Sequence, residues 1–386
     1  MSRSAVLLRS TIPAIDTAPQ IGNNDPRWFI SGWQDAEVLV MTSRQRLLAA
    51  MRFDEVDRIP VASFGLGKLD QNSPIARELI TRTDPFIEVH VPGDVYYGAA
   101  CERESWTEGD ITTTAIHTPL GNLTQRVRTT PITSGVIEFP IKTPEDVERY
   151  LSINYVKPEV DATPFHRRKA EIGQEGLVLA GIPTPVCLPA TMLSPETFCL
   201  WWEDHPELLL MLTTLFSARV NDWVDRLCKA GVDGFRLIGG EYASVQLGPS
   251  GFDALALEQD SELVDIIHRC NGIAYYHNHG PVMRFVERFA RIGMDALDPL
   301  EAPPWGDADL KRARELCGSR VAFVGNIDDM EILEKLPFEQ IEPIARQRIE
   351  SGGDRGFILG GTASGSWTEK AARNFMRLVD VAESYS

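Results

Sequence analysis

The amino-acid sequence predicts an α/β protein: a (β/α)8 barrel of the TIM type, with an inserted antiparallel hairpin and an N-terminal extension. Three observations carry this prediction. Strand-like segments alternate with longer helical segments from residue 59 onward. Several strand-like segments are almost continuously apolar, which is typical of parallel strands covered on both faces. Helical segments end at a glycine just before the next strand, and glycine is a common C-terminal stop of a helix.

The eight strand-like segments are rich in β-branched, aromatic and leucine residues. They are residues 59–64, 86–91, 176–182, 234–238, 273–278, 295–300, 321–326 and 356–361. The clearest helical segments cover 206–231, 261–272 and 281–293, with apolar residues at helical spacing. Eight strands with helices between them favour a closed barrel over an open sheet.

Two regions fall outside this alternation. Residues 109–140, approximately, are rich in threonine and valine around a Pro-Leu-Gly-Asn turn, which predicts an antiparallel hairpin inserted after the second strand. Residues 1–40 are expected to form a mostly irregular extension, since their short apolar patch is too weak for a secretion signal. The domain organisation predicted is an extension, 1–40, and one catalytic barrel domain, 41–386.

Composition narrows the range of partners. The net charge of −17 argues against nucleic acid or an anionic membrane as a general partner. No apolar run approaches the length of about 18–20 residues that a membrane span needs. The six cysteines are scattered without a Cys-x-x-Cys pair, so neither a disulfide framework nor a zinc knuckle is expected. A cytoplasmic location fits these features.

Barrel enzymes place their active sites at the carboxyl ends of the strands. In this sequence polar residues follow the fourth to seventh strands: Glu241, His277, His279, Asp298, Glu301, Asn326 and Asp328. Residues two apart on a strand point the same way, so both imidazoles can face one spot. Glu241 comes from the neighbouring strand. Two histidines and one carboxylate form a known catalytic zinc set with an open position for substrate.

The sequence therefore predicts metal ligands His277, His279 and Glu241, and catalytic roles for Glu241, Asp298 and Asn326. Plainer interpretations stay open. The histidines could hydrogen-bond a buried carboxylate, and Glu241 could pair with Arg236. Asp298 could be a turn residue, and Asn326 and Asp328 could cap the next helix. Side chains expected to line a substrate or cofactor pocket are Tyr242, Tyr276, Trp305, Asp328 and His90, although most such aromatics pack in cores.

Several segments resemble the uroporphyrinogen decarboxylase superfamily. Residues 43–65 read SRQRLLAAMRFDEVDRIPVASFG and are similar to that superfamily's opening helix, aspartate, arginine and first strand. The later matches are the His-x-His-Gly of strand five, DALDPLEAP, VGNID and GFILGGTASGSWTEKAARNFMRLVD. The resemblance covers roughly residues 40–386 and implies the same barrel fold.

Positions at which this sequence differs from the superfamily pattern distinguish between the two branches of the superfamily. Porphyrinogen decarboxylases carry an arginine-rich stretch after strand one, whereas this chain has Lys68 and no arginine before Arg77. The methyltransferase branch binds zinc through His-x-Cys and a later cysteine. His277 matches that histidine, His279 replaces the first cysteine, and residues 360–364 contain no cysteine. The resemblance implies His277 as a ligand.

Two neutral imidazoles and a carboxylate leave zinc more positive than thiolates do, which favours Lewis-acid chemistry. We therefore predict a zinc-dependent methyltransferase or demethylase. It would move a methyl group from a small O-methyl, S-methyl or halide donor to a corrinoid or tetrahydrofolate, with a corrinoid protein as a candidate partner. The extension and hairpin could support a homodimer. The alternatives are a metal-assisted decarboxylase or lyase on a small carboxylic acid, and a component that only binds a corrinoid or pterin.

Overall fold

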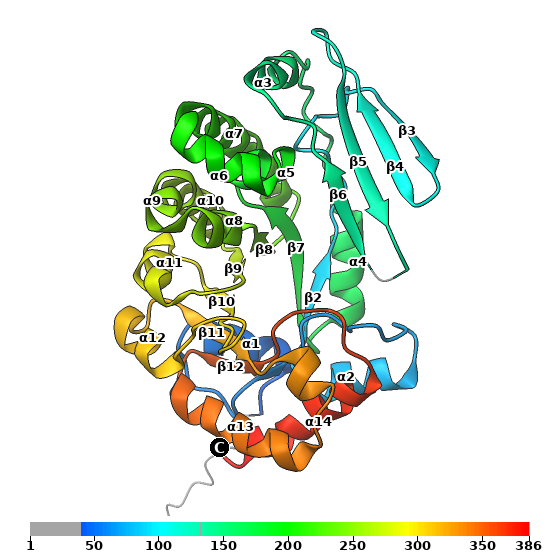
Figure 1. Ribbon diagram of the computed structural model, residues 1–386. Helices are drawn as coiled ribbons and strands as arrows, with labels where there is room; N and C mark the ends of the chain where they lie inside the picture. The colour runs from blue at the N-terminus through cyan, green and yellow to red at the C-terminus, as the bar shows by residue number, and fades with distance from the viewer. Residues whose placement is uncertain (1–39, 132, 386) are drawn as a thin grey trace, which may run out of the picture. The chain divides into compact units, whose positions relative to one another are not determined.

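The computed structural model describes residues 40–131 and 133–385 and contains the predicted barrel (Figure 1). Eight parallel strands follow the order β1-β12-β11-β10-β9-β8-β7-β2. Their bounds are β1 Val61–Ala62, β2 Phe86–Val89, β7 Leu177–Pro183, β8 Gly234–Ile238, β9 Ile273–Asn278, β10 Ala296–Pro299, β11 Ala322–Asn326 and β12 Phe357–Gly360. Each lies within or within one residue of a predicted segment, so the fold prediction is confirmed. The extension predicted for 1–40 lies outside the described residues, except for Val40.

Helices follow most strands and cover the outside of the barrel (Figure 1). They are α1 Ser43–Met51, α2 Pro74–Arg82, α3 Pro144–Leu151, α4 Thr163–Ile172, α5 Cys187–Met192, α6 Pro195–Asp204, α7 Pro206–Lys229, α8 Gly240–Gln246, α9 Gly248–Phe252, α10 Glu258–Arg269, α11 Val286–Ile292, α12 Leu310–Cys317, α13 Phe338–Gly352 and α14 Glu369–Glu383, with short π or 3-10 turns η1 Asp253–Leu257, η2 Met283–Phe285 and η3 Asp329–Leu333. Side-chain caps begin several of them, for example Ser73 on α2, Ser194 on α6 and Asp309 on α12. Within residues 40–131 and 133–385, no helix is long and apolar enough to cross a membrane.

The apolar core has two parts, because strand residues alternate between the inside of the barrel and the helices. The inner part contains Phe86, Leu179, Tyr275, Val324 and Ile358, packed with Leu47 and Met51 of α1. The outer part is much larger and lies between the sheet and the helices. Residues of β9 show the alternation directly, since Ile273 and Tyr275 belong to the inner core and Ala274 and Tyr276 to the outer.

The insertion is a four-stranded antiparallel sheet (Figure 1). The predicted hairpin is its central pair, β4 Ile111–Ile116 and β5 Leu123–Thr129, joined through the Pro-Leu-Gly-Asn turn. Flanking strands β3 Arg103–Glu108 and β6 Ser134–Glu138 extend it on both sides. Both edges carry charged and polar side chains, and every residue of β3 is exposed.

Strands β1 and β2 close the barrel through very few contacts. Their only ladder contact among the described residues is one bridge, Phe64 to Phe86. Asp84, which is fully buried, reinforces this seam: its Oδ2 accepts from the amide of Val61 at 2.9 Å, and its own amide donates to the Val61 carbonyl at 2.8 Å. The closure of the barrel therefore depends on a buried carboxylate.

Two arginines neutralise Asp84. Arg46 of α1 donates to its Oδ1 at 2.5 Å, and Arg58 donates to its Oδ2 at 2.7 Å. Arg46 also binds Asp57 at 2.6 Å. Burial alone would raise the pKa of Asp57, but hydrogen bonds from Arg46 and from backbone amides lower it instead. The Asp57-Arg58 pair of the family-like opening segment is thus a structural feature of the barrel base.

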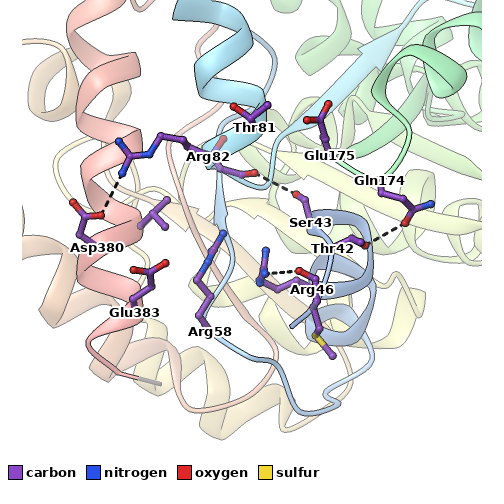
Figure 2. Close-up of a pocket in the computed structure, with 13 residues that line it drawn as sticks. Thr42, Ser43, Arg46, Arg58, Thr81, Arg82, Gln174, Glu175, Asp380 and Glu383 are labelled. Carbon is purple, nitrogen blue, oxygen red and sulfur yellow. Dashed lines mark hydrogen bonds and ion pairs between the residues drawn. The ribbon is translucent and has the colours of Figure 1, made fainter. Parts of the chain in front are cut away.

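The cluster borders a polar pocket of about 550 Å³ at the amino-terminal end of the barrel (Figure 2). Figure 2 shows Arg46 and Arg58 in it, with Arg82 directed toward Asp380 of α14. The pocket is formed by the starts of α1 and β7 and the ends of α2 and α14. Barrel enzymes use the opposite end for catalysis, so we assign this end to stability.

We predict that Asp84→Asn lowers the free energy of unfolding by about 3 kcal/mol or more, because two guanidinium groups lose a buried counter-charge. The matched control is Asp380→Asn, whose ion pair with Arg82 is exposed and should matter by less than about 0.5 kcal/mol. Urea unfolding followed by circular dichroism measures both. Equal losses in the two variants would contradict the assigned role of Asp84.

Candidate functional site

The two histidines lie at the carboxyl end of β9. His277 continues the inward-facing series of Ile273 and Tyr275 and is buried, with 5% of its surface exposed. His279 follows just after the strand and is partly exposed at the mouth of the barrel. Their ring centres are 4.4 Å apart and the rings are nearly perpendicular, at 87°. The prediction that both imidazoles share one region is therefore confirmed.

Asp298 holds His277. The register of β9 and β10 places the two residues opposite each other, and the distance from His277 Nδ1 to Asp298 Oδ1 is 2.9 Å. Burial and the nearby charge of Asp298 raise the pKa of Tyr275. An ionised carboxylate only accepts hydrogen bonds, so Nδ1 of His277 carries the proton. This tautomer leaves Nε2 with a free lone pair, as in metal-binding histidines that donate their other nitrogen to a carboxylate.

Glu301 holds His279 in the same way. The distance from His279 Nδ1 to Glu301 Oε1 is 3.0 Å, and the amide of Gly280 donates to Glu301 Oε2 at 2.7 Å. The hydrogen bond with Glu301 raises the pKa of His279 above its usual value and outweighs burial. Burial would raise the pKa of Glu301, but the bonds from His279 and Gly280 lower it. The sequence showed Glu301 at this end without assigning it this role.

Glu241 lies in the first turn of α8, directly after β8. Its Oε2 is buried and has no hydrogen-bond partner among the residues that the structure describes, and its charge contributes to the raised pKa of His279. Within residues 40–131 and 133–385, however, no three His, Cys, Asp or Glu side chains already lie together as a metal-binding group. The ligand set of His277, His279 and Glu241 therefore stays a prediction.

Arg236 pairs with Glu88 rather than with Glu241, which rules out one alternative role for Glu241. Arg236 is buried on β8, and its Nη1 lies 2.7 Å from Glu88 Oε2 on β2. Its guanidinium carbon lies 4.1 Å from the centre of the Phe64 ring. Sequence reasoning missed this pair. The available signal was a charged residue inside each of two otherwise apolar strands, which is costly to bury without a partner.

Asn326, Asp328 and Trp305 line a pocket of about 340 Å³ beside the histidines, which Glu301 also lines. Asn326 donates to the Leu300 carbonyl at 2.7 Å, while its Oδ1 is buried without a partner. Asp328 accepts from the amides of Met330 and Glu331 and so caps η3, as one alternative proposed. The structure thus brings Asn326, Asp328 and Trp305 together next to His279.

The other predicted pocket residues lie elsewhere. Tyr276 is fully buried on the outer face of β9, and its hydroxyl donates to Asp260 at 2.5 Å. Tyr242 lies half-buried on α8, where burial and the nearby Cys187 raise its pKa to about 12. His90 lines a separate pocket of about 810 Å³ beside the ends of β1 and β2. The structure does not join these three residues to the group around His279.

Comparisons with known proteins agree with the fold. The family model described as "Uroporphyrinogen decarboxylase (URO-D)" matches residues 42–385. "Methylcobamide:CoM methyltransferase MtaA" from Methanosarcina barkeri is 22% identical over 320 residues, covering 81% of this chain and 90% of that protein. The solved structure of a methyltransferase from Methanosarcina mazei superposes with a TM-score of 0.61 at 16% identity, covering 90% of this chain and all of that chain.

The buried carboxyl group behind the site gives a prediction about pH. Burial raises the pKa of Asp260 to about 7, against about 3.9 in an unfolded chain. Between these values the folded protein retains a proton that the unfolded chain has lost, so the free energy of unfolding falls as pH rises, by up to about 1.4 kcal/mol per unit. We expect Asp260→Asn, which cannot titrate, to gain stability relative to wild type from pH 5 to pH 8.

Urea unfolding at both pH values tests this. Asp265→Asn changes an exposed carboxyl group on the same helix and serves as the control, with no comparable pH-dependent gain. A stability difference between Asp260→Asn and wild type that stays constant across the range would refute the assignment.

Proposed function

The chain belongs to the uroporphyrinogen decarboxylase family, and from this premise we propose that it is a zinc-dependent methyltransferase. It would take a methyl group from a small methylated donor and pass it to a corrinoid or to tetrahydrofolate. The observation that carries the proposal is the pair of imidazoles at the barrel mouth, each held at Nδ1 by a carboxylate and neither bonded at Nε2 to any of the residues that the structure describes. The methyltransferases similar in sequence and in fold support the reaction class.

In this proposal His277 and His279 bind zinc through Nε2. Asp298 and Glu301 fix the tautomer and the ring orientation, which commonly strengthens metal binding. Glu241 would supply the third ligand through its unpartnered Oε2, after its side chain turns toward the histidines. When bound, the metal would supply a Lewis acid next to the donor. The burial of His277 limits access of water to this spot, while His279 stays partly exposed.

Methyl transfer breaks the bond from the methyl carbon to its oxygen, sulfur or halide and forms a bond to the nucleophilic acceptor. The leaving group keeps the electron pair, and an alkoxide or phenoxide then takes up a proton. The acceptor could be a free tetrahydrofolate or a corrinoid carried by a partner protein, and the assay below distinguishes them.

The charge of the mouth favours this chemistry over porphyrinogen decarboxylation. Carboxylates Glu88, Asp298, Glu301 and Asp328 all lie at the strand ends, while Arg236 is already paired with Glu88. A substrate with four carboxylates would meet repulsion there and few free cations. A small donor with at most one anionic group avoids this cost.

We expect the purified protein to contain about one zinc per chain and to lose it in His277→Ala and in His279→Ala, because each variant removes a nitrogen ligand. Plasma mass spectrometry measures the metal, and circular dichroism checks the fold. Methyl loss from a panel of donors should require an added corrinoid or tetrahydrofolate. Carbon dioxide release from a small acid without any acceptor would instead favour a lyase.

Asp298→Asn should weaken zinc binding by about 10- to 100-fold, because the amide can present the wrong group to Nδ1 and no longer fixes the tautomer. Competition with a chromogenic chelator measures the affinity. Asp295→Asn is the matched control: Asp295 holds His268 at 3.0 Å in a similar pair at the other end of β10. Equal zinc affinity in both variants would count against Asp298 as a positioning residue.

A further inference from the structure

The pocket beside His279 contains a cation that the proposed chemistry does not use. Arg348 of α13 lines this pocket together with Glu301, Trp305 and Asn326. Among the described residues, Arg348 forms only one hydrogen bond. It is long, 3.4 Å from Nη1 to Gln347 Oε1. The Nε of Arg348 is buried and has no hydrogen-bond partner within residues 40–131 and 133–385. Burial lowers the pKa of this guanidinium, as expected where no carboxylate compensates the loss of water.

The acidic residues of the same pocket are already occupied. Glu301 accepts from His279, Asp328 accepts from two backbone amides, and Glu331 pairs with Lys335 at 2.5 Å. None of these contacts involves Arg348. In a protein of net charge −17, an arginine that forms no ion pair with any described residue is poorly satisfied, and an incoming anion would satisfy it.

Apart from Asn326 and Thr362, the rest of the wall is apolar and partly aromatic. Pro303, Pro304 and Ile332 line the pocket, and Trp305 does so with 61% of its surface exposed. Backbone bonds from Ala308 to Glu301 and from Gly306 to Ala302 hold this loop in place. An exposed indole on a fixed loop offers a flat surface for an aromatic ring. The unpartnered Oδ1 of Asn326 adds one hydrogen-bond acceptor.

We propose that this pocket binds the methyl donor, and that the donor is an aromatic methyl ether carrying a carboxylate. The ring lies against Trp305 and the prolines, and the carboxylate pairs with Arg348. Because Glu301 belongs both to the pocket and to the His279 pair, a methoxy group at the other side of the ring is directed toward the histidines. This inference rests on the proposed methyltransferase function and names its donor class.

Binding without turnover tests it. The full-length protein, without any acceptor, is titrated calorimetrically with 2-, 3- and 4-methoxybenzoate and with the corresponding methoxybenzamides, which have nearly the same shape but no charge. We expect at least one benzoate to bind about tenfold or more tightly than its amide, because a carboxylate can form a charge-assisted, bidentate contact with the guanidinium. Arg348→Gln should remove that preference while leaving the affinity for the amide within about threefold.

Arg346→Gln is the control, because Arg346 lies on the same helix, pairs with Glu342 and does not line the pocket. It should keep the preference of the wild type. The inference is overturned if no benzoate is preferred over its amide in the wild type, or if Arg348→Gln keeps the preference. The wild-type comparison remains decisive even if Arg348→Gln folds poorly. Selective binding without methyl transfer would separate a failure of the proposed reaction from a failure of this inference.

Discussion

The contact on which the barrel depends is the buried carboxylate of Asp84. In the described part of the chain, the segment of β1 meets β2 in one bridge, from Phe64 just after β1 to Phe86. Asp84 links the two strands through Val61, while Arg46 and Arg58 balance its charge. Closure is what divides each strand into an inner and an outer face. Alternate residues of a strand face the interior or the helices only when the barrel is closed. Closure therefore directs His277 into the mouth and Tyr276 away from it.

Polar groups at the other end of the barrel are arranged by the same register. Pairing of β9 with β10 sets Asp298 opposite His277, and pairing of β8 with β9 sets Arg236 opposite Tyr275. Buried polar side chains are costly unless they find partners, and here the partners come from neighbouring strands. The geometry of the two imidazoles is therefore a consequence of strand register as much as of the local His-x-His sequence.

Much of the fold could be predicted because buried parallel strands consist of nearly continuous apolar residues, as in residues 176–182 and 321–326. The edge strands β3 and β6 could not, since they are mostly exposed and largely polar. In the site, the spacing of His277 and His279 identified the pair. Their carboxylate partners depend on register, which a single sequence does not give. The position of Tyr276, in contrast, could be predicted from the sequence. It is adjacent to His277 on the strand, and adjacent strand residues point to opposite faces.

Buried polar atoms without hydrogen-bond partners can indicate where a ligand would bind. Several buried polar atoms lack a hydrogen bond, and some, such as Thr213 Oγ1 in α7, lie far along the chain from any strand end. Glu241 Oε2, Asn326 Oδ1 and Arg348 Nε differ, because the charge of Glu241 acts on His279 and the other two side chains line the pocket that Glu301 shares with His279. The carboxylate of Glu241 needs a cation and the guanidinium of Arg348 needs an anion, while the amide oxygen of Asn326 accepts a hydrogen bond. A metal held by the histidines and an anionic ring in the pocket would meet these needs together, which is why the two proposals are complementary in charge.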